Sequence, residues 1–454
     1  MVFVLALAAG GTATRAQSMS DNGIFYHSFT SPWSSSLNPA LFPESAKWYV
    51  ALARTGADIS LPFSLHDMNL QYDPQRGAAV FNATDFLRLL AERKCRFGMN
   101  ADVNLVGIGF SIGPGLHFTF DAGARVTGCA SIPLEVTRVL TEGNLNGNRH
   151  LSLGTTMPAR VMAYAYASAG VSFSMPEAPV AVGVRFNLLD GYGMASIDRL
   201  TLDVSTAADT SSLTILMDYL AHYAGPHPIS EDCYQKENEF LPRFMPESFG
   251  YTFDLGVKFK LQGIDISASL LDIGPGITWS NNSSVITPPE GNVPIQFDGI
   301  DVHRINEPGY FDGWKDTLLH RLEYQCTGET FRYTPPTRVY IGASYSLLRM
   351  LRVGYLFHGE WESGWFNSFG EGDFRMNNSL SLHFSLLDWL ELTAANSFAY
   401  NGQTWDFFNP GMAVSLNPFR RLQVYAAIDY VSSFDLTKMR AAHVYFGINI
   451  FGHR

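Results

Sequence analysis

Strict alternation of apolar and polar residues in two adjoining segments constrains this chain more than any other feature. From Tyr251 to Phe259 every second residue is apolar, and after a Gln-Gly turn the alternation resumes from Ile264 to Leu270. Side chains of an extended strand point alternately to its two faces, so one face of this hairpin is wholly apolar and the other carries charges. A soluble core would not accept those charges unpaired. A barrel wall with lipid outside and a polar interior accommodates both faces.

The same alternation recurs along the whole chain, in segments joined pairwise by tight turns. Fourteen segments can be placed, at about 46–57, 97–112, 115–130, 158–174, 178–190, 249–260, 263–273, 337–347, 349–359, 376–387, 389–400, 408–416, 420–431 and 441–451. Six tight turns can be read, at 113–114, 176–177, 262–263, 347–348, 387–388 and 417–418. An even number of strands closes a barrel without an exposed edge. We therefore expect an all-β fold, a transmembrane antiparallel β-barrel of about 14 strands. A soluble β-sandwich is the less favoured alternative.

The remaining connections are long and rich in aromatic residues. They cover roughly 58–96, 131–157, 191–248 and 274–336. We expect them to be outer-rim loops that contain short helices, at Thr84–Lys94, Pro133–Glu142 and Trp314–Arg321. Loops of this composition are expected to fold, and either to cap the pore or to contact a partner.

Charge and motif content exclude several function classes. The net charge is −11 and no basic cluster occurs, so nucleic acid is not expected as a partner. The nucleophile elbow, the zinc-protease helix motif and the phosphate-binding loop are all absent from the sequence. We therefore expect no enzyme activity and no cofactor. His222, His227, Glu231, Asp232 and Cys233 form the densest group of metal-ligand residue types, but loop polarity explains them as well.

The first residues resemble an export signal. Residues 1–16 contain a short apolar core followed by Thr14-x-Ala16, which suits a signal peptidase, although the usual basic start is missing. A buried N-terminal strand is the alternative. We expect 1–16 to be a signal peptide, 17–45 a segment in the periplasm or the lumen, and 46–454 the barrel. This predicts a location in the outer membrane, with lipid as the surrounding partner.

Export makes disulfide bonds feasible for the four cysteines. Cys95 and Cys129 flank one predicted hairpin, while Cys233 and Cys326 lie in two long loops expected at the same rim. Of three connectivities we favour 95–129 with 233–326, and unpaired thiols are the alternative.

A family resemblance rests on several motifs in fixed order. Asn38, Pro39 and Ala40 form an NPA element, followed by GYTFDLGVKFKLQGIDISASLLDIG, IQFDGIDV and PPTRVYIGASYSL. With these segments the chain resembles a Bacteroidetes outer-membrane family of unknown function, and more distantly the long-chain fatty acid transporter (FadL-like) and accessory barrels of type IX secretion. The resemblance implies a fourteen-stranded barrel and supplies no activity. The fatty acid transporters have an N-terminal plug, and here a short segment such as Phe25 to Leu41 could enter the lumen.

Two sets of residues are candidates for function. Gly274, Pro275 and Gly276 interrupt a regular strand, and a break there could open a lateral gap for a hydrophobic solute, or the strand could simply leave the membrane. Charged residues of both signs are expected to face the lumen and to form a packed, charge-paired interior. They are Asp102, Asp121, Arg125, Arg185, Asp254, Lys258, Lys260 and Asp265.

Two functions remain open at this point. The first is a non-enzymatic outer-membrane barrel that passes or binds a small, mainly hydrophobic solute. The second is an accessory or scaffold barrel of a secretion or assembly complex, with other envelope proteins as partners. The NPA element, the strand number and the Gly-Pro-Gly break slightly favour the first.

Overall fold

The computed structural model describes the barrel and most of its attachments. The described residues are 23–43, 46–61, 63–68, 71–73, 78–80, 95–113, 115–132, 151–175, 178–206, 213–227, 248–288, 295–297, 324–361, 374–386, 389–400, 405–419, 421–435 and 437–453. The predicted signal peptide and the three predicted loop helices lie outside them.

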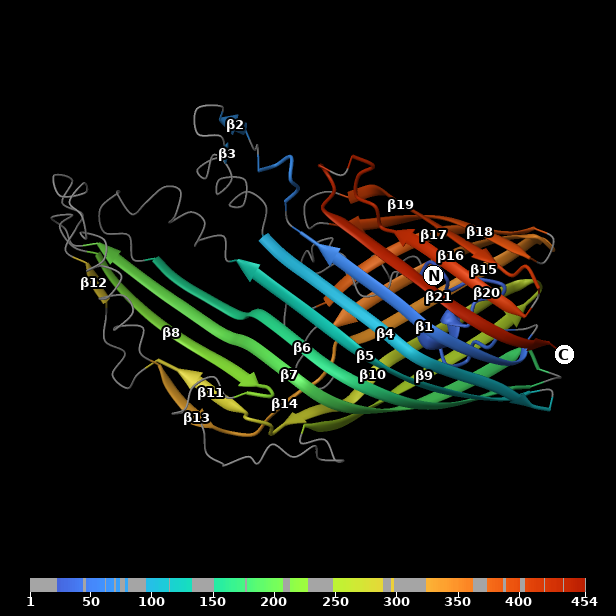
Figure 1. The fold of residues 1–454 in the computed structure, drawn as a ribbon, viewed down its shortest axis with the longest axis horizontal. Coiled ribbons are helices and arrows are strands. Elements are labelled where there is room, and N and C mark those ends of the chain that lie inside the picture. The colour runs from blue at the N-terminus through green and yellow to red at the C-terminus, as the bar shows by residue number, and fades with distance from the viewer. Residues whose placement is uncertain are drawn as a thin grey trace.

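Fourteen antiparallel strands close into one barrel (Figure 1). They are β1 (Ala46–Ser60), β4 (Cys95–Ile112), β5 (Leu116–Ile132), β6 (Leu151–Ser174), β7 (Val180–Thr206), β9 (Phe249–Leu261), β10 (Ile264–Trp279), β15 (Thr337–Leu348), β16 (Leu351–Trp361), β17 (Phe374–Leu386), β18 (Leu390–Tyr400), β19 (Trp405–Leu416), β20 (Leu422–Asp429) and β21 (Ala441–His453). The last strand pairs with the first, from Ala46 opposite His453 to Ser60 opposite Ala441. The predicted fold class is confirmed.

The outer surface of the barrel wall is apolar. Val184, Leu255 and Val444, from three different strands, each expose close to half of their surface, at 45%, 47% and 47%. Polar residues of the same strands point inward, as the alternation predicts. An apolar surface that continues around the wall is typical of a barrel that spans lipid. Among the described helices none is both long and apolar enough to cross a bilayer.

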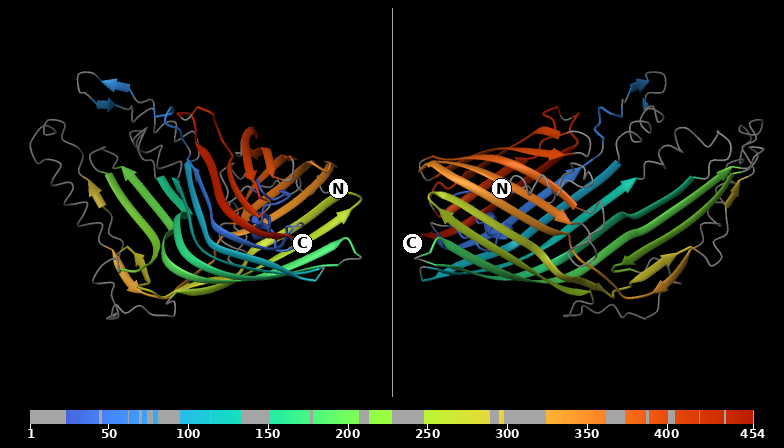
Figure 2. Two further views of the ribbon diagram at one scale, coloured as in Figure 1. Left: turned by 45° about the vertical axis from the view of Figure 1, so that its right-hand side comes forward. Right: turned by 180° about the vertical axis from the view of Figure 1, so that it is seen from behind.

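The two ends of the barrel differ. One end, here called the turn rim, carries the short turns, one of which lies at Arg349–Met350 rather than at the predicted 347–348 because Leu348 still pairs with Leu351. The other end, the loop rim, bears a sheet that extends beyond the barrel on one side (Figures 1 and 2). The small hairpin of β2 (Gln71–Asp73) and β3 (Ala78–Val80) also lies at this end.

This extension, here called the wing, corrects the predicted loop at 191–248. β7 pairs with β9 up to Asp190 and with β8 (Leu213–Ala224) from Met194 onward. The glycines of Asp190-Gly-Tyr-Gly suggest a turn, but Gly191 leaves room for the ring of Trp279, and a Cβ there would lie 2.7 Å from that ring. The rest of the wing comprises β11 (Ser284–Thr287), β12 (Ile295–Phe297), β13 (Gln325–Gly328) and β14 (Phe331–Tyr333).

Residues 23–43 lie inside the barrel and are here called the plug. They include the one described helix, α2 (Trp33–Leu37), a five-residue turn. Phe25, Trp33 and Leu37 are 2–5% exposed. Phe25 and Trp33 pack edge-on against Tyr425 and Tyr445 of the wall, which supplies the main apolar cluster inside the barrel.

Candidate functional site

The NPA element lies on a flat patch of wall that two glycines create. Gly183 of β7 and Gly256 of β9 stand directly opposite each other in the ladder. A Cβ on Gly183 would lie 2.3 Å from the carbonyl of Pro39, and one on Gly256 would lie 2.1 Å from Asn38 Oδ1. The backbone of the plug can therefore approach the wall only because neither position has a side chain.

Asn38 fixes the plug to this patch. It is fully buried, and its Nδ2 donates to Tyr26 Oη at 3.0 Å and to the carbonyl of Ala268 at 3.2 Å. Its Oδ1 accepts from the backbone N–H of Ala40 at 2.9 Å. With the carbonyl of Val257, which accepts from the same Nδ2 at 3.4 Å, four partners from the plug and two wall strands meet at one amide. The NPA sequence therefore has a structural role in holding the plug.

On the opposite wall the plug is held by a single carboxylate. Glu391 of β18 is 4% exposed and accepts from Ser28 Oγ at 3.0 Å, from Phe29 N at 3.0 Å and from Thr30 Oγ1 at 2.7 Å. His383 lies 3.7 Å from the same carboxylate. These contacts are polar, so water can replace them when this part of the plug moves.

Two arginines hold the carbonyl groups of the plug. Arg185 donates to the carbonyls of Ser35 at 3.1 Å and Ser36 at 2.7 Å. Arg352 donates to the carbonyl of His27 at 3.0 Å, and its guanidinium carbon lies 4.1 Å from the ring centre of Phe29. Charged wall residues therefore anchor the plug at several points around the lumen.

A polar cavity, here called the chamber, lies on the loop-rim side of the plug. The volume in it that the centre of a water-sized sphere can reach is about 70 Å³. Trp33 and Leu37 of the plug form part of its lining, and the remaining lining carries four arginines and five aspartates. The charged residues are Arg54, Arg125, Arg185, Arg338, Asp58, Asp102, Asp121, Asp254 and Asp272.

Ion pairs link most of these charges. Asp272 lies 2.6 Å from Arg338 and 3.6 Å from Arg125, while Arg125 lies 2.6 Å from Asp102. Arg185 lies 2.6 Å from Asp254, whose other oxygen accepts from the backbone N–H of Asp272 at 2.7 Å. The chamber is therefore lined by a connected network of charges rather than by an apolar surface.

Arg54 reaches the chamber through a bulge. The register of β1 shifts between Leu52 and Thr55, and Ala53 has a φ of 49° in the left-handed region. Tyr49 and Ala51 point into the lumen, so regular alternation without the bulge would next turn residues 53 and 55 inward. The bulge instead turns Arg54 inward, where it is 6% exposed and lies 5.0 Å from the ring centre of Trp33.

The predicted lumen-facing residues fall on both sides of the plug. Asp121, Arg125, Arg185 and Asp254 belong to the chamber. Lys258 and Asp265 lie 3.5 Å apart near the turn rim. Together with Lys260, Lys258 lines a second cavity of about 290 Å³ beneath Ala40–Pro43.

The segment Gly274–Gly276 is a double bulge within β10. The register against β9 shifts on both sides of Ile273, and Gly274 and Gly276 have φ values of 152° and 72°. A Cβ on Gly276 would lie 2.3 Å from the carbonyl of Tyr333, and one on Gly250 would lie 2.1 Å from the carbonyl of Gly276. The strand continues through the bulge to Trp279 in close contact with both neighbours. Lateral opening here stays a prediction.

A separate polar group occupies the wing. Asp198 accepts from Tyr333 Oη, and His222 Nδ1 lies 2.7 Å from Asp198 Oδ2. The predicted ligand group around His222 is not assembled among the described residues, where no three His, Cys, Asp or Glu side chains are grouped to hold a metal. The carbonyl of His227 accepts from Tyr223 at 2.8 Å, and 231–233 lie outside the described residues.

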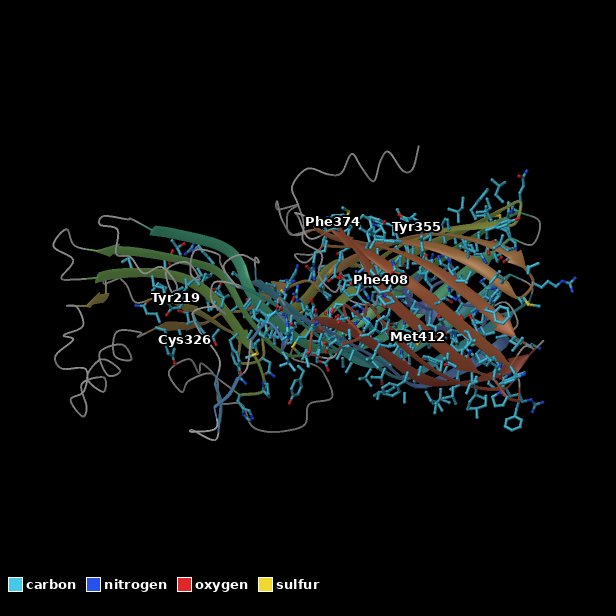
Figure 3. All side chains as sticks on the ribbon, turned by 90° about the horizontal axis from the view of Figure 1, so that it is seen from above. Tyr219, Cys326, Tyr355, Phe374, Phe408 and Met412 are labelled. Carbon is cyan, nitrogen blue, oxygen red and sulfur yellow. The ribbon has the colours of Figure 1, made fainter. Side chains whose placement is uncertain are left out.

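One predicted disulfide is wrong. Cys129 is a free thiol. In the ladder it stands opposite Gly98, whereas Cys95 stands opposite Ile132, so the two cysteines are offset by three residues, or roughly 10 Å along the strands. Cys326 is disulfide-bonded. Figure 3 places it on the wing near Tyr219, away from the barrel residues Tyr355 and Met412. Cys233 lies outside the described residues, so its pairing with Cys326 stays a prediction.

Sequence reasoning did not identify Arg54, Glu391, Gly183 or Gly256. The sequence does contain a signal for Arg54. The inward-facing residues of β1 are odd-numbered over 49–51 and even-numbered from Arg54, and such a change in alternation indicates a bulge. The glycines and Glu391 gave no local signal, because their role depends on the plug, which is distant in sequence.

Comparison with known proteins gives one family and several distant folds. A model described as a family of unknown function (DUF5723) matches residues 39–429. No curated protein matches the chain.

Three solved structures resemble the chain weakly. The toluene transporter TbuX of Ralstonia pickettii is 10% identical, with 93% of this chain and 94% of that chain covered and a TM-score of 0.44. The toluene transporter TodX of Pseudomonas putida is 10% identical, with 96% and 98% covered and a TM-score of 0.40. A FadL homologue of Pseudomonas aeruginosa is 9% identical, with 97% and 99% covered and a TM-score of 0.43. Similarity this low does not extend to sites or solutes.

Proposed function

The chain belongs to the family of unknown function (DUF5723), and we propose that it is a non-enzymatic outer-membrane barrel that binds a small solute in the chamber and passes it when the plug moves. The predicted membership of a family of unknown function is thereby confirmed, and a Bacteroidetes origin stays a prediction. The observation that carries the proposal is a charged chamber inside the lumen, whose floor includes a plug anchored to the wall by polar as well as apolar contacts.

The orientation follows from the ends of the barrel. Short turns are typical of the periplasmic end of outer-membrane barrels, and long connections of the outer end. The wing and the chamber then lie toward the outside, and Lys258 and Lys260 lie at the periplasmic exit beneath the plug. A solute would enter the chamber first and would leave past Ala40–Pro43.

The chamber lining bears on the kind of solute. The sequence favours a mainly hydrophobic one, and Trp33, Leu37 and Leu189 supply apolar contacts. The ion-paired arginines and aspartates that complete the lining favour a solute that also carries polar groups, because an apolar solute would separate them from water without replacing their hydrogen bonds.

Liposome swelling with the purified full-length protein tests passage. Wild-type protein should pass small solutes such as glycerol slowly. Glu391→Ala should raise the rate severalfold, because three hydrogen bonds to the plug are lost. Glu329→Ala, a change at an exposed residue of the wing, should behave as wild type. A rate that stays at the level of empty liposomes for wild type and Glu391→Ala alike would rule the proposal out.

The wing supports a second candidate, an accessory barrel that binds another envelope protein. It extends well beyond the barrel at the loop rim (Figure 2), and Tyr192 and Tyr324 expose 68% and 45% of their surface. Exposed tyrosines are common in protein interfaces. Purification in mild detergent should then retain a stoichiometric partner, which is lost when Tyr192 and Tyr324 are both changed to Ser.

A further inference from the structure

Arg54 differs from the other arginines of the chamber in its hydrogen bonds. Arg125, Arg185 and Arg338 each donate at least two hydrogen bonds to carboxylates, hydroxyls or carbonyls. Arg54 donates none to any described residue, and its nearest carboxylate, Asp121, lies 3.7 Å away. A guanidinium has five N–H donors, and those of Arg54 are available to a solute in the chamber.

The place of Arg54 indicates which chemical group would satisfy it. The bulge at Ala53 turns it into the chamber, and Trp33 covers one face of the guanidinium. The N–H groups at the edge of the guanidinium can therefore donate to a planar acceptor in the chamber. A carboxylate matches the fork of a guanidinium with two parallel hydrogen bonds.

The charge of the chamber argues against a simple anion. Five aspartates and four arginines line it, so the lining is already negative by one formal charge. A solute with only a carboxylate would add to that excess. A solute that also carries an ammonium group would leave the balance unchanged and could pair with an aspartate.

Asp102 is the aspartate best placed for such an ammonium group. It stands opposite Gly56 in the ladder of β1 and β4, diagonal to Arg54 on the same face, where neighbours are roughly 7–8 Å apart. Its side chain is 30% exposed, whereas that of Asp121 is 6% exposed. Although Arg125 and Tyr166 donate to it, a carboxylate has about four acceptor positions.

We propose that the chamber binds a zwitterionic solute of the α-amino acid class, with its carboxylate on Arg54 and its ammonium group on Asp102. This inference rests on the proposed function, because it names the solute class of the same chamber. It gives the donors of Arg54 a partner, uses a remaining acceptor position of Asp102, and leaves the net charge of the lining unchanged.

Calorimetric titration of the full-length protein in detergent tests the proposal with three probes of similar size. Glycine carries both charges, glycolate only the carboxylate, and ethanolamine only the ammonium group. Glycine should bind roughly tenfold more tightly than either of the others, since each lacks one charged hydrogen-bonding group. Glycolate binding as tightly as glycine, or no binding of glycine, would overturn the proposal.

Variants assign the two ends of the solute. Arg54→Gln and Asp102→Asn should each weaken glycine binding about tenfold, and Asp102→Asn should leave glycolate binding undiminished. Arg199→Gln, which removes an exposed ion pair with Asp218 on the wing, is the matched control. Circular dichroism checks folding. If Arg54→Gln fails to fold, Arg54→Lys replaces it, because it keeps the charge and loses the fork. Equal glycine affinity in Asp102→Asn and the control would refute the assignment.

The proposed transport function and the proposed solute class can be disproved independently of each other. Glycerol swelling reports passage alone, and glycine calorimetry reports binding alone. Glycerol passage without glycine binding would reject only the solute class. Glycine binding without passage of any solute would reject the transport function and keep the binding site.

Discussion

Single buried polar residues anchor the plug of this barrel beside its apolar cluster. On one side of the lumen, Asn38 accepts from the backbone of Ala40 and donates to the wall carbonyl of Ala268. On the other side, Glu391 of the wall accepts from the backbone N–H of Phe29. A buried polar group that loses its partner is left unsatisfied, so single changes should act strongly on the plug and weakly on the wall.

Asn38→Ala should loosen the plug by about 2–3 kcal/mol, because it removes the amide that joins Tyr26, Ala268 and Ala40. Hydrogen exchange of residues 23–43, followed by mass spectrometry, should rise by one to two orders of magnitude. Ser36→Ala is the control, since its hydroxyl bonds only to the carbonyl of Trp33 within the plug. Unchanged exchange in Asn38→Ala would show that the glycine patch alone holds the plug.

Acid should weaken the wing through Asp198. Burial favours its neutral form, but hydrogen bonds from His222, Tyr333 and Ser196 outweigh burial and lower the pKa of Asp198. Its stabilising contribution is therefore present above the ordinary pKa of an aspartate and is lost as the pH falls through the lowered one. Pepsin cleavage within 194–224 should increase below roughly pH 4, and Asp198→Asn should remove this pH dependence. Identical acid profiles of the two proteins would contradict the prediction.

At the scale of strands, the sequence predicts the wall well and its irregularities poorly. Alternation places each of the fourteen barrel strands, because a two-residue period is a local property. The bulges at Ala53 and Ile273 and the continuation of β7 beyond Asp190 depend on hydrogen bonds to neighbouring strands. Glycine and proline after Ile273 and Asp190 suggest turns, whereas the neighbouring strands keep these segments in the sheet.

Gly183→Ala tests the patch that two strands build for the NPA element. Its Cβ would lie 2.3 Å from the backbone of Pro39, so the plug must shift away from β7. We expect hydrogen exchange of 23–43 to rise and swelling to accelerate, with the barrel still folded. Gly193→Ala is the matched control on the same strand, because the nearest atom to its Cβ would be 3.6 Å away. Equal behaviour of the two variants would mean that the plug does not depend on this contact.

At the scale of the whole molecule, the wall and the plug form by different interactions. The barrel is closed by strand pairing alone, from β1 round to β21, and no strand of the ladder comes from the plug. The sequence indicates a lumen segment through its length and the NPA element. It could not indicate the chamber, because the chamber exists only where Trp33 meets side chains from distant strands.

Removal of residues 23–43 should therefore leave a closed barrel with an open lumen. The ladder keeps its backbone hydrogen bonds, so circular dichroism should still report a β-barrel. The melting temperature should fall, because Tyr425 and Tyr445 lose their packing against Phe25 and Trp33 and Glu391 loses its plug partners. Swelling with glycerol should exceed that of Glu391→Ala, since no plug remains to reclose. Loss of the barrel signal on deletion would show instead that the wall needs the plug to fold, and that plug and barrel form one cooperative unit.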